Sequence, residues 1–351
     1  MDYRVLLYFP FGFIGGIGAY FIGLPMPFML GGIFGAAAFV LTYERSGDRL
    51  PKLSRWVRLV FMSLIGAMIG SRFTAEFLSL LPQFWISGAA IIPFILIALG
   101  GNFALLWKLG GYNKVDAYYA SLPGGLVDAT ALAEQAGADM RVVTAQHFIR
   151  IILVVVTIPV LFFLISGDVV GSLAGESLAA ADYGQSDVFW IIGIGLVGLF
   201  FGRLSKLPVS HMLGPLILAL ILSITGVISI NIPEWMTHLA QFMIGTALGA
   251  QFSGMSRRLL MKGLGMGLLS GAFMLLLAAG FALTLVNLVP AGFEALFISF
   301  AAGGLAEMSL IALSLNFNPI VVALHHLVRI FVTVWTGLLL ARVVLKQEQK
   351  T

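Results

Sequence analysis

The 351-residue sequence contains no cysteine and few charged residues. The absence of cysteine excludes disulfide bonds, thiolate metal sites and cysteine nucleophiles. Charged residues make up 10 % of the chain, against roughly 25 % in an average soluble domain. Hydrophobic residues make up 60 %, and the mean hydropathy is +1.02. A water-soluble fold could not bury this much apolar surface, so we expect an all-α polytopic protein that lies in a lipid bilayer.

Histidine is also scarce, and its spacing does not suit a metal site. The five histidines show no ligand-like spacing, and the adjacent pair His325 and His326 points to different faces of a helix. Metal-dependent oxygen chemistry needs imidazole and carboxylate ligands that converge on one ion. We therefore expect no metal ion, no cofactor and no enzymatic activity.

The formal charge of +4 and the isoelectric point near 9.4 do not indicate nucleic-acid binding. The basic residues lie in short gaps between apolar runs, where they report the orientation of a membrane protein. Direct DNA binding needs a cytoplasmic recognition element, and no basic gap is longer than about 15 residues. We expect no direct contact with nucleic acid.

The chain carries an internal duplication. The run Leu122–Asp128 returns 179 residues later as Ala301–Glu307, and each run holds a glycine pair followed by an acid. Three further matches keep the same order: His147–Arg150 returns as His326–Arg329 and Ile65–Gly70 as Ile244–Gly249 at the same offset, and Leu24–Gly31 returns as Leu207–Gly214 at an offset of 183. Repeats of this kind, with glycine-interrupted apolar stretches and ionisable residues in both copies, are typical of secondary transporters.

Ten apolar stretches approach the length of about 20 residues that a membrane-spanning helix needs. They cover 5–22, 26–43, 57–72, 83–107, 142–165, 188–204, 208–228, 235–252, 263–289 and 319–344. Two further stretches, 116–137 and 295–316, are interrupted after only about eight residues, so each half-helix is too short to span alone. We expect re-entrant hairpins or discontinuous helices, which lipid tolerates only where protein or a polar cavity covers the freed backbone.

The distribution of charge predicts the orientation of the spans. The gap 44–58 is rich in arginine and lysine, whereas the linker 167–187 holds four acids and no basic residue. Because basic loops face the cytoplasm, five crossings in each copy place the basic gaps inside and the acidic linker outside, except for Arg72, which sits at a helix end and can extend toward water. Six crossings per copy would leave the linker inside. The second copy is therefore predicted to be inverted, with both termini cytoplasmic.

The predicted organisation is about ten transmembrane helices and two broken or re-entrant segments, arranged as two inverted five-helix repeats. The first membrane repeat covers 1–166, the extracytoplasmic acidic linker 167–187, the second and inverted repeat 188–346, and the cytoplasmic tail 347–351.

The residues around the two breaks form the candidate site. After each glycine pair the chain re-enters a helix, whose unpaired backbone N–H groups and positive dipole end attract an anion. The acid about one turn further on can complement that dipole, coordinate a cation or carry a transported proton. Each His-x-x-Arg pair shares one helix face and lies on the order of 12–15 Å deep. The candidate substrate- or ion-binding residues are Gly124, Gly125, Asp128, His147, Arg150, Gly303, Gly304, Glu307, His326 and Arg329.

Two interpretations of these residues stay open. An arginine at this depth is costly without a partner and marks either a pathway or a structural ion pair. In the first interpretation, Arg150 pairs with Asp128 and Arg329 with Glu307, and the pairs only hold the broken helices. In the second, the same residues line a substrate or proton site between the two copies. For the histidines, the alternative to a functional role is a neutral interior side chain with satisfied hydrogen bonds.

Several glycine series are interpreted as packing surfaces. Gly193, Gly195 and Gly198 match a dinucleotide fingerprint, but they lie in an apolar helix with no preceding strand. Small residues four apart let transmembrane helices approach closely, as in Gly66 with Gly70, Gly245 with Gly249, and Gly263 with Gly267 and Gly271. We expect Pro25 and Pro208 to start the second helix of each copy. The glycine-lined helices could also serve a homodimer.

The doubled pattern of a glycine pair, an acid and His-x-x-Arg resembles the membrane AbrB family of bacterial proteins, over roughly residues 5–345. That family is associated by name with regulation of gene expression and is often labelled an ammonia monooxygenase, and it shares only its name with the soluble DNA-binding AbrB. The resemblance implies a multi-pass protein of the bacterial cytoplasmic (inner) membrane. Any effect on transcription should be indirect.

The function expected from these observations is secondary transport or export of a small, anionic solute or ion. Asp128, Glu307, His147 and His326 are the candidates for proton or ion coupling, and Arg150 and Arg329 for charge balance or substrate contact. The alternative is a membrane sensor or scaffold that takes part in the regulation of gene expression without transport.

Overall fold

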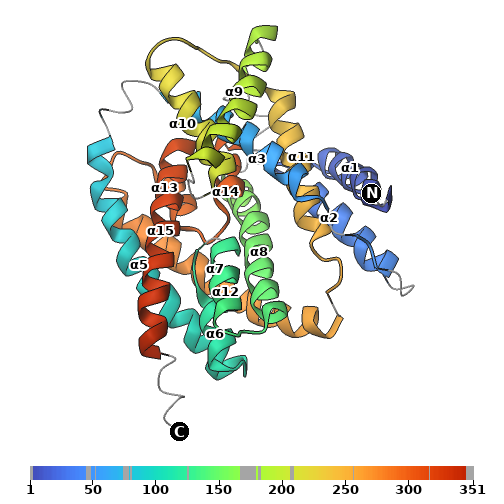
Figure 1. The fold of residues 1–351 in the computed structure, drawn as a ribbon, viewed down its shortest axis with the longest axis vertical. Coiled ribbons are helices and arrows are strands. Elements are labelled where there is room, and N and C mark those ends of the chain that lie inside the picture. Colours follow the sequence, from blue (N-terminus) through green and yellow to red (C-terminus); the bar gives the residue numbers. More distant parts are fainter. Residues whose placement is uncertain are drawn as a thin grey trace. The chain divides into compact units, whose positions relative to one another are not determined.

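The computed structural model describes residues 3–44, 49–51, 53–73, 79, 81–124, 126–166, 179–180, 183–205, 209–255, 257–315 and 317–344. The fold is all-helical apart from one pair of two-residue strands among these residues (Figure 1). The chain divides into two compact units. Unit 1 comprises Met1–Ser79, Ile158–Gly254 and Ser309–Ile320, and unit 2 comprises Leu80–Thr157, Met255–Met308 and Val321–Thr351. Each unit therefore contains segments from both copies of the repeat.

Unit 1 is built mainly from six helices. They are α1 (Tyr8–Phe21), preceded by the 3-10 turn η1 (Tyr3–Leu7), α2 (Pro27–Tyr43), α3 (Arg55–Gly70), α9 (Gln185–Leu204), α10 (Ser210–Ile224) and α11 (Glu234–Ala250). The strands β1 (Ala179–Ala180) and β2 (Ile232–Pro233) pair in parallel in the same unit.

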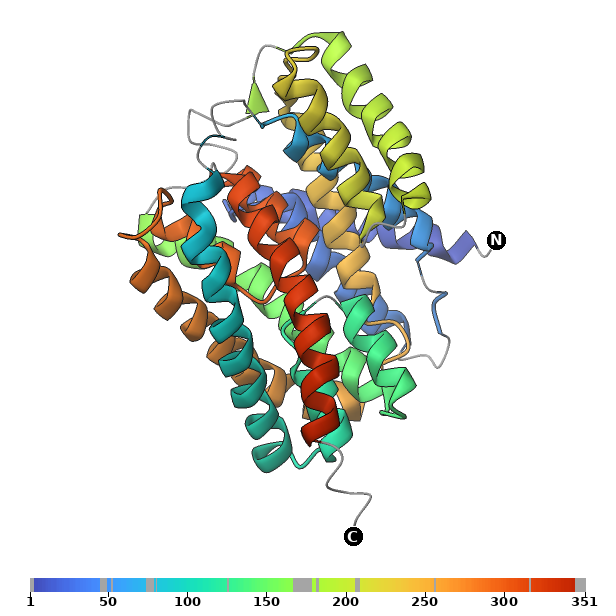
Figure 2. The ribbon, with the colours of Figure 1, turned by 60° about the vertical axis from the view of Figure 1, so that its left-hand side comes forward.

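Unit 2 contains the breaks of both interrupted segments. Its helices are α5 (Trp85–Ala104), preceded by η3 (Leu81–Phe84) and continued by the π-helical turn η4 (Leu105–Leu109), α6 (Lys114–Ser121), α7 (Leu126–Gln135), α12 (Arg257–Leu285) and α13 (Phe293–Phe300). Three helices contribute residues to both units: α8 (Met140–Ser166), α14 (Leu305–Ser314) and α15 (Pro319–Val344). In unit 2, α5 and α15 run side by side (Figure 2), and Leu99 packs in one cluster with Leu340 and Val344.

Six described helical segments are long and apolar enough to cross a membrane. They are Tyr3–Phe21, Pro82–Leu109, Met140–Ile165, Gln185–Leu204, Gly263–Leu285 and Pro319–Ala341. The other four predicted spans form the shorter helices α2, α3, α10 and α11, of which the longest have 17 residues. A 17-residue helix is about 25 Å long, less than the roughly 30 Å of a bilayer core.

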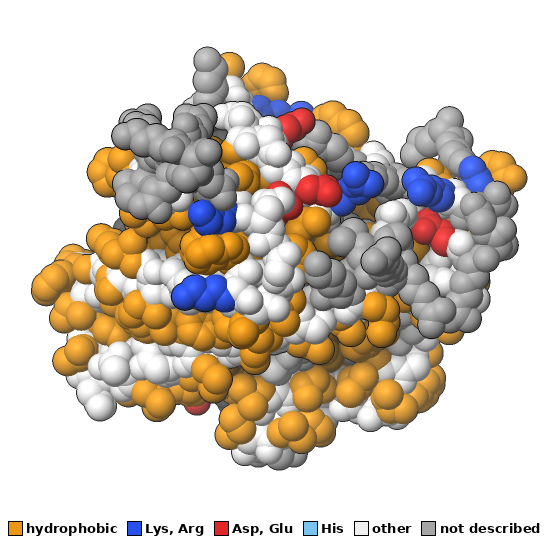
Figure 3. All heavy atoms as spheres, turned by 90° about the horizontal axis from the view of Figure 1, so that it is seen from below, with side chains coloured by type: hydrophobic (Ala, Val, Ile, Leu, Met, Phe, Trp, Pro, Cys, Tyr) orange, Lys and Arg blue, Asp and Glu red, His pale blue; other side chains and the backbone are white. Residues whose placement is uncertain are grey.

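The surface fits an integral membrane protein. Large hydrophobic side chains such as Phe189, Leu196 and Phe200 on α9 are exposed. On the face drawn in Figure 3, hydrophobic side chains cover broad areas between smaller groups of charged side chains. Extensive exposed apolar surface of this kind marks contact with lipid or with another protein.

Glycines join helices from different copies inside unit 1. An ideal Cβ on Gly66 of α3 would lie 2.3 Å from the carbonyl oxygen of Met212 on α10, and one on Gly70 would lie equally close to that of Leu216. The equivalent glycines of α11 lie against the Met29 and Ile33 carbonyls of α2 in the same way. In both pairs, the glycine further along one helix contacts the carbonyl further along the other helix. Helix α3 is therefore parallel to α10, and α2 is parallel to α11. The interpretation of these glycines as packing residues is confirmed.

The remaining glycine series differ in detail. Gly263, Gly267 and Gly271 on α12 lie against side chains of α8, as expected. On α9, Gly198 lies against the Pro215 backbone, whereas a Cβ on Gly193 would meet nothing within 4 Å. The packing interpretation therefore holds for Gly198 and is wrong for Gly193.

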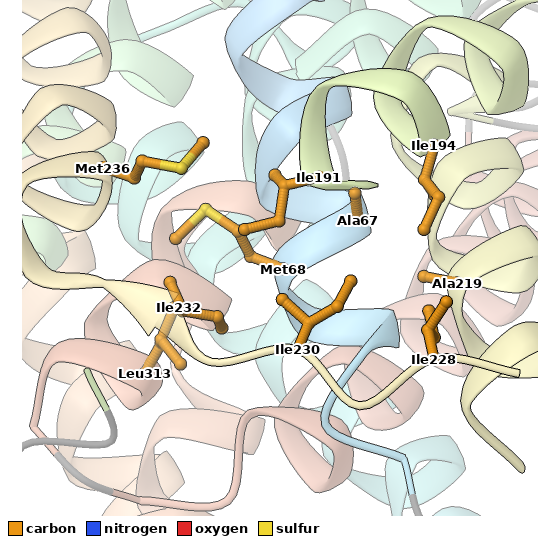
Figure 4. Close-up of a cluster of buried hydrophobic side chains, with 10 residues drawn as sticks. All are labelled: Ala67, Met68, Ile191, Ile194, Ala219, Ile228, Ile230, Ile232, Met236 and Leu313. Atoms are coloured by element: carbon orange, nitrogen blue, oxygen red, sulfur yellow. The ribbon is translucent and has the colours of Figure 1, made fainter. Parts of the chain in front are cut away.

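A shared core connects α3, α9, α10 and α11 (Figure 4). Met68, near the end of α3, and Met236, near the start of α11, belong to this one cluster. Because the end of one helix meets the start of the other, α3 and α11 run in opposite directions. Leu313 of α14 and the isoleucines of the segment between α10 and α11 complete the cluster.

The starts of α2 and α10 share an unusual backbone. Met26 and Val209 precede these helices with φ of 48° and 46°, and they are the two non-glycine residues with positive φ in the described chain. They occupy equivalent positions in the two copies. The helix α2 begins at Pro27 and not at Pro25 as predicted, because Met26 still has a left-handed conformation, and Pro208 lies outside the described residues.

Polar contacts hold particular segment ends together in unit 1. The Glu44 carboxylate at the end of α2 accepts hydrogen bonds from Ser253 Oγ at 2.7 Å and the Gly254 N–H at 2.9 Å, beyond the end of α11. At the end of α10, Ser223 Oγ donates to the Phe73 carbonyl at 2.8 Å, beyond the end of α3.

Candidate functional site

Both predicted breaks are present in unit 2. Helix α6 ends at Ser121 and α7 begins at Leu126, and α13 ends at Phe300 and α14 begins at Leu305. The helices before the breaks, α6 and α13, have eight residues each, as the sequence predicts. The ends of a helix leave backbone carbonyl and N–H groups without partners inside that helix, so both breaks offer such groups to other side chains.

In the first copy, α8 supplies the side chains that bind the break. Arg150 Nη2 donates to the Leu122 carbonyl at 3.0 Å and contacts His147 Nδ1 at 3.0 Å. His147 Nε2 lies 2.9 Å from the Tyr119 carbonyl. One His-x-x-Arg pair thus binds two carbonyls, three residues apart, at the end of α6.

In the second copy, α15 repeats this arrangement. Arg329 donates to the carbonyls of Ala301 and Gly303, the latter at 2.7 Å, and contacts His326 Nδ1 at 2.9 Å. His326 Nε2 lies 3.1 Å from the Ile298 carbonyl. Ala301 and Ile298 are the repeat equivalents of Leu122 and Tyr119.

The arginines determine the tautomer of both histidines. A guanidinium group has donors and no acceptor, so His147 Nδ1 and His326 Nδ1 accept. Each Nε2 therefore carries the proton and donates to a carbonyl, in an assignment that follows from the hydrogen-bond network. Both histidines are buried with both ring nitrogens bonded, which is the neutral, satisfied state that the sequence left as an alternative. In this arrangement each histidine orients its arginine.

The position of Glu307 differs from the one that the ion-pair interpretation predicts. Among the described side chains, Glu307 forms no ion pair with Arg329, whose partners are backbone carbonyls and His326. The buried Glu307 carboxylate instead folds back over Gly304, where an ideal Cβ would lie 2.0 Å from Oε2. As the third residue of α14 it complements the positive end of that helix. Gly125 and the side chain of Asp128 lie outside the described residues, and so does the predicted pair of Asp128 with Arg150.

One face of α15 reaches both breaks. One turn after Arg329, Thr333 lies against Gly124 of the first break, where an ideal Cβ would be 2.7 Å from Thr333 Cγ2. One turn further, the Gly337 carbonyl accepts a hydrogen bond from Tyr118 Oη at 2.7 Å. Thr333 and Gly337 were not among the predicted site residues, although their positions four and eight residues after Arg329 put all three on one helix face.

The arginines retain unused hydrogen-bond donors. Arg150 and Arg329 are only 2 % and 3 % exposed. Within the described part of the chain, Arg150 Nε and Nη1 and Arg329 Nε have no hydrogen-bond partner. The site thus concentrates positive charge where solvation is poor, which costs several kcal/mol unless an anion compensates it.

The chain, with its two copies of this site, is similar to proteins of one known family. A family model described as "Transition state regulatory protein AbrB" matches residues 28–345. The chain belongs to the AbrB family. Its membership confirms the resemblance seen in the sequence, and the AbrB match includes both breaks and both His-x-x-Arg pairs.

Two relatives match most of this chain. "Putative regulator AbrB" of Escherichia coli (strain K12) is 25 % identical over 329 residues, which are 93 % of this chain and 92 % of the relative. "Uncharacterized protein YhjN" of Bacillus subtilis (strain 168) is 25 % identical over 300 residues, which are 80 % of this chain and 76 % of the relative.

Proposed function

We propose that this AbrB-family protein is a secondary transporter or exporter of a small anionic solute in the bacterial cytoplasmic membrane. The observation that carries the proposal is the pair of buried arginines, Arg150 and Arg329, one at each helix break and both with N–H donors that bond to none of the described residues. Paired discontinuous helices at an interface of repeats are typical binding sites of secondary transporters.

An inverted repeat is part of the proposal, and directions within unit 2 support it. Along α8, His147 and Arg150 contact Tyr119 and then Leu122, so α8 follows the direction of α6. Along α15, the first contact with this region is at Gly124 and the later one, from Gly337, is at Tyr118. Helix α15 therefore opposes α6 and also α8, its own repeat equivalent.

Unit 1 independently supports the same arrangement. Helix α2 is parallel to α11, α3 is parallel to α10, and α3 opposes α11. It follows that α2 opposes α10 and α3 opposes α11, although these are equivalent helices of the two copies. An arrangement of five crossings per copy, with ten spans and both termini cytoplasmic, also places Glu44 with Ser253, and Ser223 with Phe73, on common sides of the membrane.

In the proposed mechanism the anion binds between the breaks, beside Gly124 and Gly303 and the first turns of α7 and α14. Arg150 and Arg329 contact it, and His147 and His326 position the arginines. Asp128 and Glu307, one in each copy, are the candidates for a coupled proton or cation. Because the solute is moved and not transformed, the protein is not an enzyme, and its effects on gene expression are indirect and involve no nucleic acid.

The test is uptake of radiolabelled small anions into proteoliposomes that contain the purified protein, driven by a proton or sodium gradient. We expect saturable flux that falls by at least tenfold in Arg150→Gln or Arg329→Gln and loses its dependence on the gradient in Glu307→Gln and Asp128→Asn. The absence of flux for every anion under every gradient would overturn transport. Gradient dependence that persists in both acid variants would overturn the coupling role.

A regulatory role without transport is the second candidate, favoured by the printed names of the family and of the Escherichia coli relative. A sensor or scaffold would move nothing across a sealed bilayer. If deletion of the protein changes transcript levels and the transport-dead Arg329→Gln variant restores them, the regulatory candidate is the correct one.

A further inference from the structure

We infer that Thr333 joins Arg150 and Arg329 in one oxyanion subsite, in which the hydroxyl group selects the ligand. The inference deepens the proposed function, since it names the substrate class. It requires anion binding at the breaks but not transport.

Thr333 has the properties of a ligand contact. It is 2 % exposed, and its Oγ1 has no hydrogen-bond partner in the part of the chain that the structure describes. Buried threonine hydroxyls in helices normally bond back to the carbonyl of the preceding turn. Thr336, one turn along the same helix, does this through Val332 at 2.7 Å. Among the described residues, the hydroxyl of Thr333 therefore differs from that of Thr336 in having no hydrogen-bond partner.

The position of Thr333 connects the two breaks. It follows Arg329 by one helical turn on the same face, and it lies against Gly124, two residues after the carbonyl that binds Arg150. Thr333 therefore lies between the first break, at Gly124, and the guanidinium group that binds the second break. The equivalent residue of the first copy, Val154, is apolar and fully buried, so the subsite is polar on one side only and binds its ligand in one orientation.

The number and type of donors indicate the chemical class. Arg150 Nε and Nη1, Arg329 Nε and Thr333 Oγ1 are four separate atoms on three side chains. A halide offers one atom to such donors, whereas a carboxylate, sulfate or phosphate group offers several oxygens. Planar guanidinium groups match the oxygens of these oxyanions. We therefore assign the subsite to a small oxyanion and not to a halide.

The experiment measures equilibrium binding by calorimetry on the full-length protein in an uncharged detergent, with acetate, succinate, sulfate, phosphate and chloride as probes at constant ionic strength. At least one oxyanion should bind saturably at one site per chain, and chloride should not compete. Thr333→Val should weaken that binding about tenfold, as expected for the loss of one hydrogen bond to a charged group. Thr333→Ser should stay within about twofold of the native protein.

Thr336→Val is the matched control, because it removes a satisfied hydroxyl from the same helix. It should leave the affinity unchanged. Equal affinities in Thr333→Val and the native protein, or competition by chloride as strong as by any oxyanion, would overturn the subsite. Binding by phosphatidylglycerol alone would also overturn it, because the occupant would then be a lipid headgroup and not a soluble oxyanion.

The binding experiment and the transport experiment can fail independently of each other. Oxyanion binding that depends on the Thr333 hydroxyl, without flux in proteoliposomes, supports the subsite and removes the transporter. Flux that is unchanged in Thr333→Val supports the transporter and removes the subsite. Thermal unfolding of each ligand-free variant verifies that the substitutions leave the protein folded.

Discussion

Arg329 donates a hydrogen bond to His326 Nδ1 at 2.9 Å, deep inside unit 2. His326 Nε2 in turn donates a hydrogen bond to the Ile298 carbonyl, so the histidine links the guanidinium group to the end of α13. The same relationship joins Arg150 to His147 in the other copy. The same geometry is therefore present in both copies of the repeat.

The first prediction concerns this histidine. His326→Phe preserves a flat ring but removes both nitrogens, which leaves the Ile298 carbonyl and one Arg329 N–H without partners. Each orphaned group costs about 1–3 kcal/mol, so we expect a clear fall in the unfolding temperature measured in detergent. His238→Phe is the control, because His238 lies 3.6 Å from the half-exposed Glu234, and it should change stability by less than about 1 kcal/mol. Equal falls in the two variants would contradict the positioning role.

The second prediction compares two glycines of one helix. Gly198→Ala places a methyl group 2.3 Å from the Pro215 Cα, and such overpacking costs about 1–3 kcal/mol. Gly193→Ala meets nothing within 4 Å and should stabilise α9 by about 0.5–1 kcal/mol, because alanine is the better helix former. Thermal unfolding of the two variants should shift in opposite directions. A destabilised Gly193→Ala would show that its surroundings are more crowded than described.

The third prediction tests the inverted repeat. Asp139 and Asn318 are equivalent, exposed residues whose side chains accept hydrogen bonds at the start of α8 and α15. Because the natural chain has no cysteine, Asp139→Cys and Asn318→Cys each introduce a single thiol. In intact cells a membrane-impermeant maleimide should label Asn318→Cys and spare Asp139→Cys, and both should react after lysis. Labelling of both variants in intact cells, with controls that show sealed membranes, would contradict inversion.

The fourth prediction concerns a buried polar pair between α5 and α12. Ser270 Oγ donates to Asn102 Oδ1 at 2.7 Å, and both residues are buried. Polar contacts between helices in membrane proteins couple by about 0.6–1.7 kcal/mol. A double-mutant cycle with Asn102→Leu and Ser270→Ala, measured by unfolding, should give a coupling energy in this range. A coupling energy near zero would mean that the two side chains do not interact in the folded protein.

The sequence predicted the elements whose signal lies in side chains. The glycine pairs located both breaks to within a few residues, and the His-x-x-Arg spacing identified the side chains that bind them. The family resemblance came from the same residues. Each of these predictions rests on a pattern of residue types that occurs in both copies of the repeat.

What the sequence did not predict depends on the backbone. One of the two interpretations paired Arg329 with the acid Glu307, but Arg329 binds the carbonyls of Ala301 and Gly303. A carbonyl partner cannot be recognised from the residue types. Thr333 was missed because its role depends on contact with Gly124, more than 200 residues away. The length of α10 was overestimated, because the apolar residues Val227 and Ile228 beyond its end at Ile224 were taken as helical.

The parallel pairs α2–α11 and α3–α10 have a consequence for the independence of the two copies. Each pair buries a glycine face of one copy against the backbone of the other. Neither copy can therefore cover its own glycine face, and expression of one half without the other would leave that face exposed.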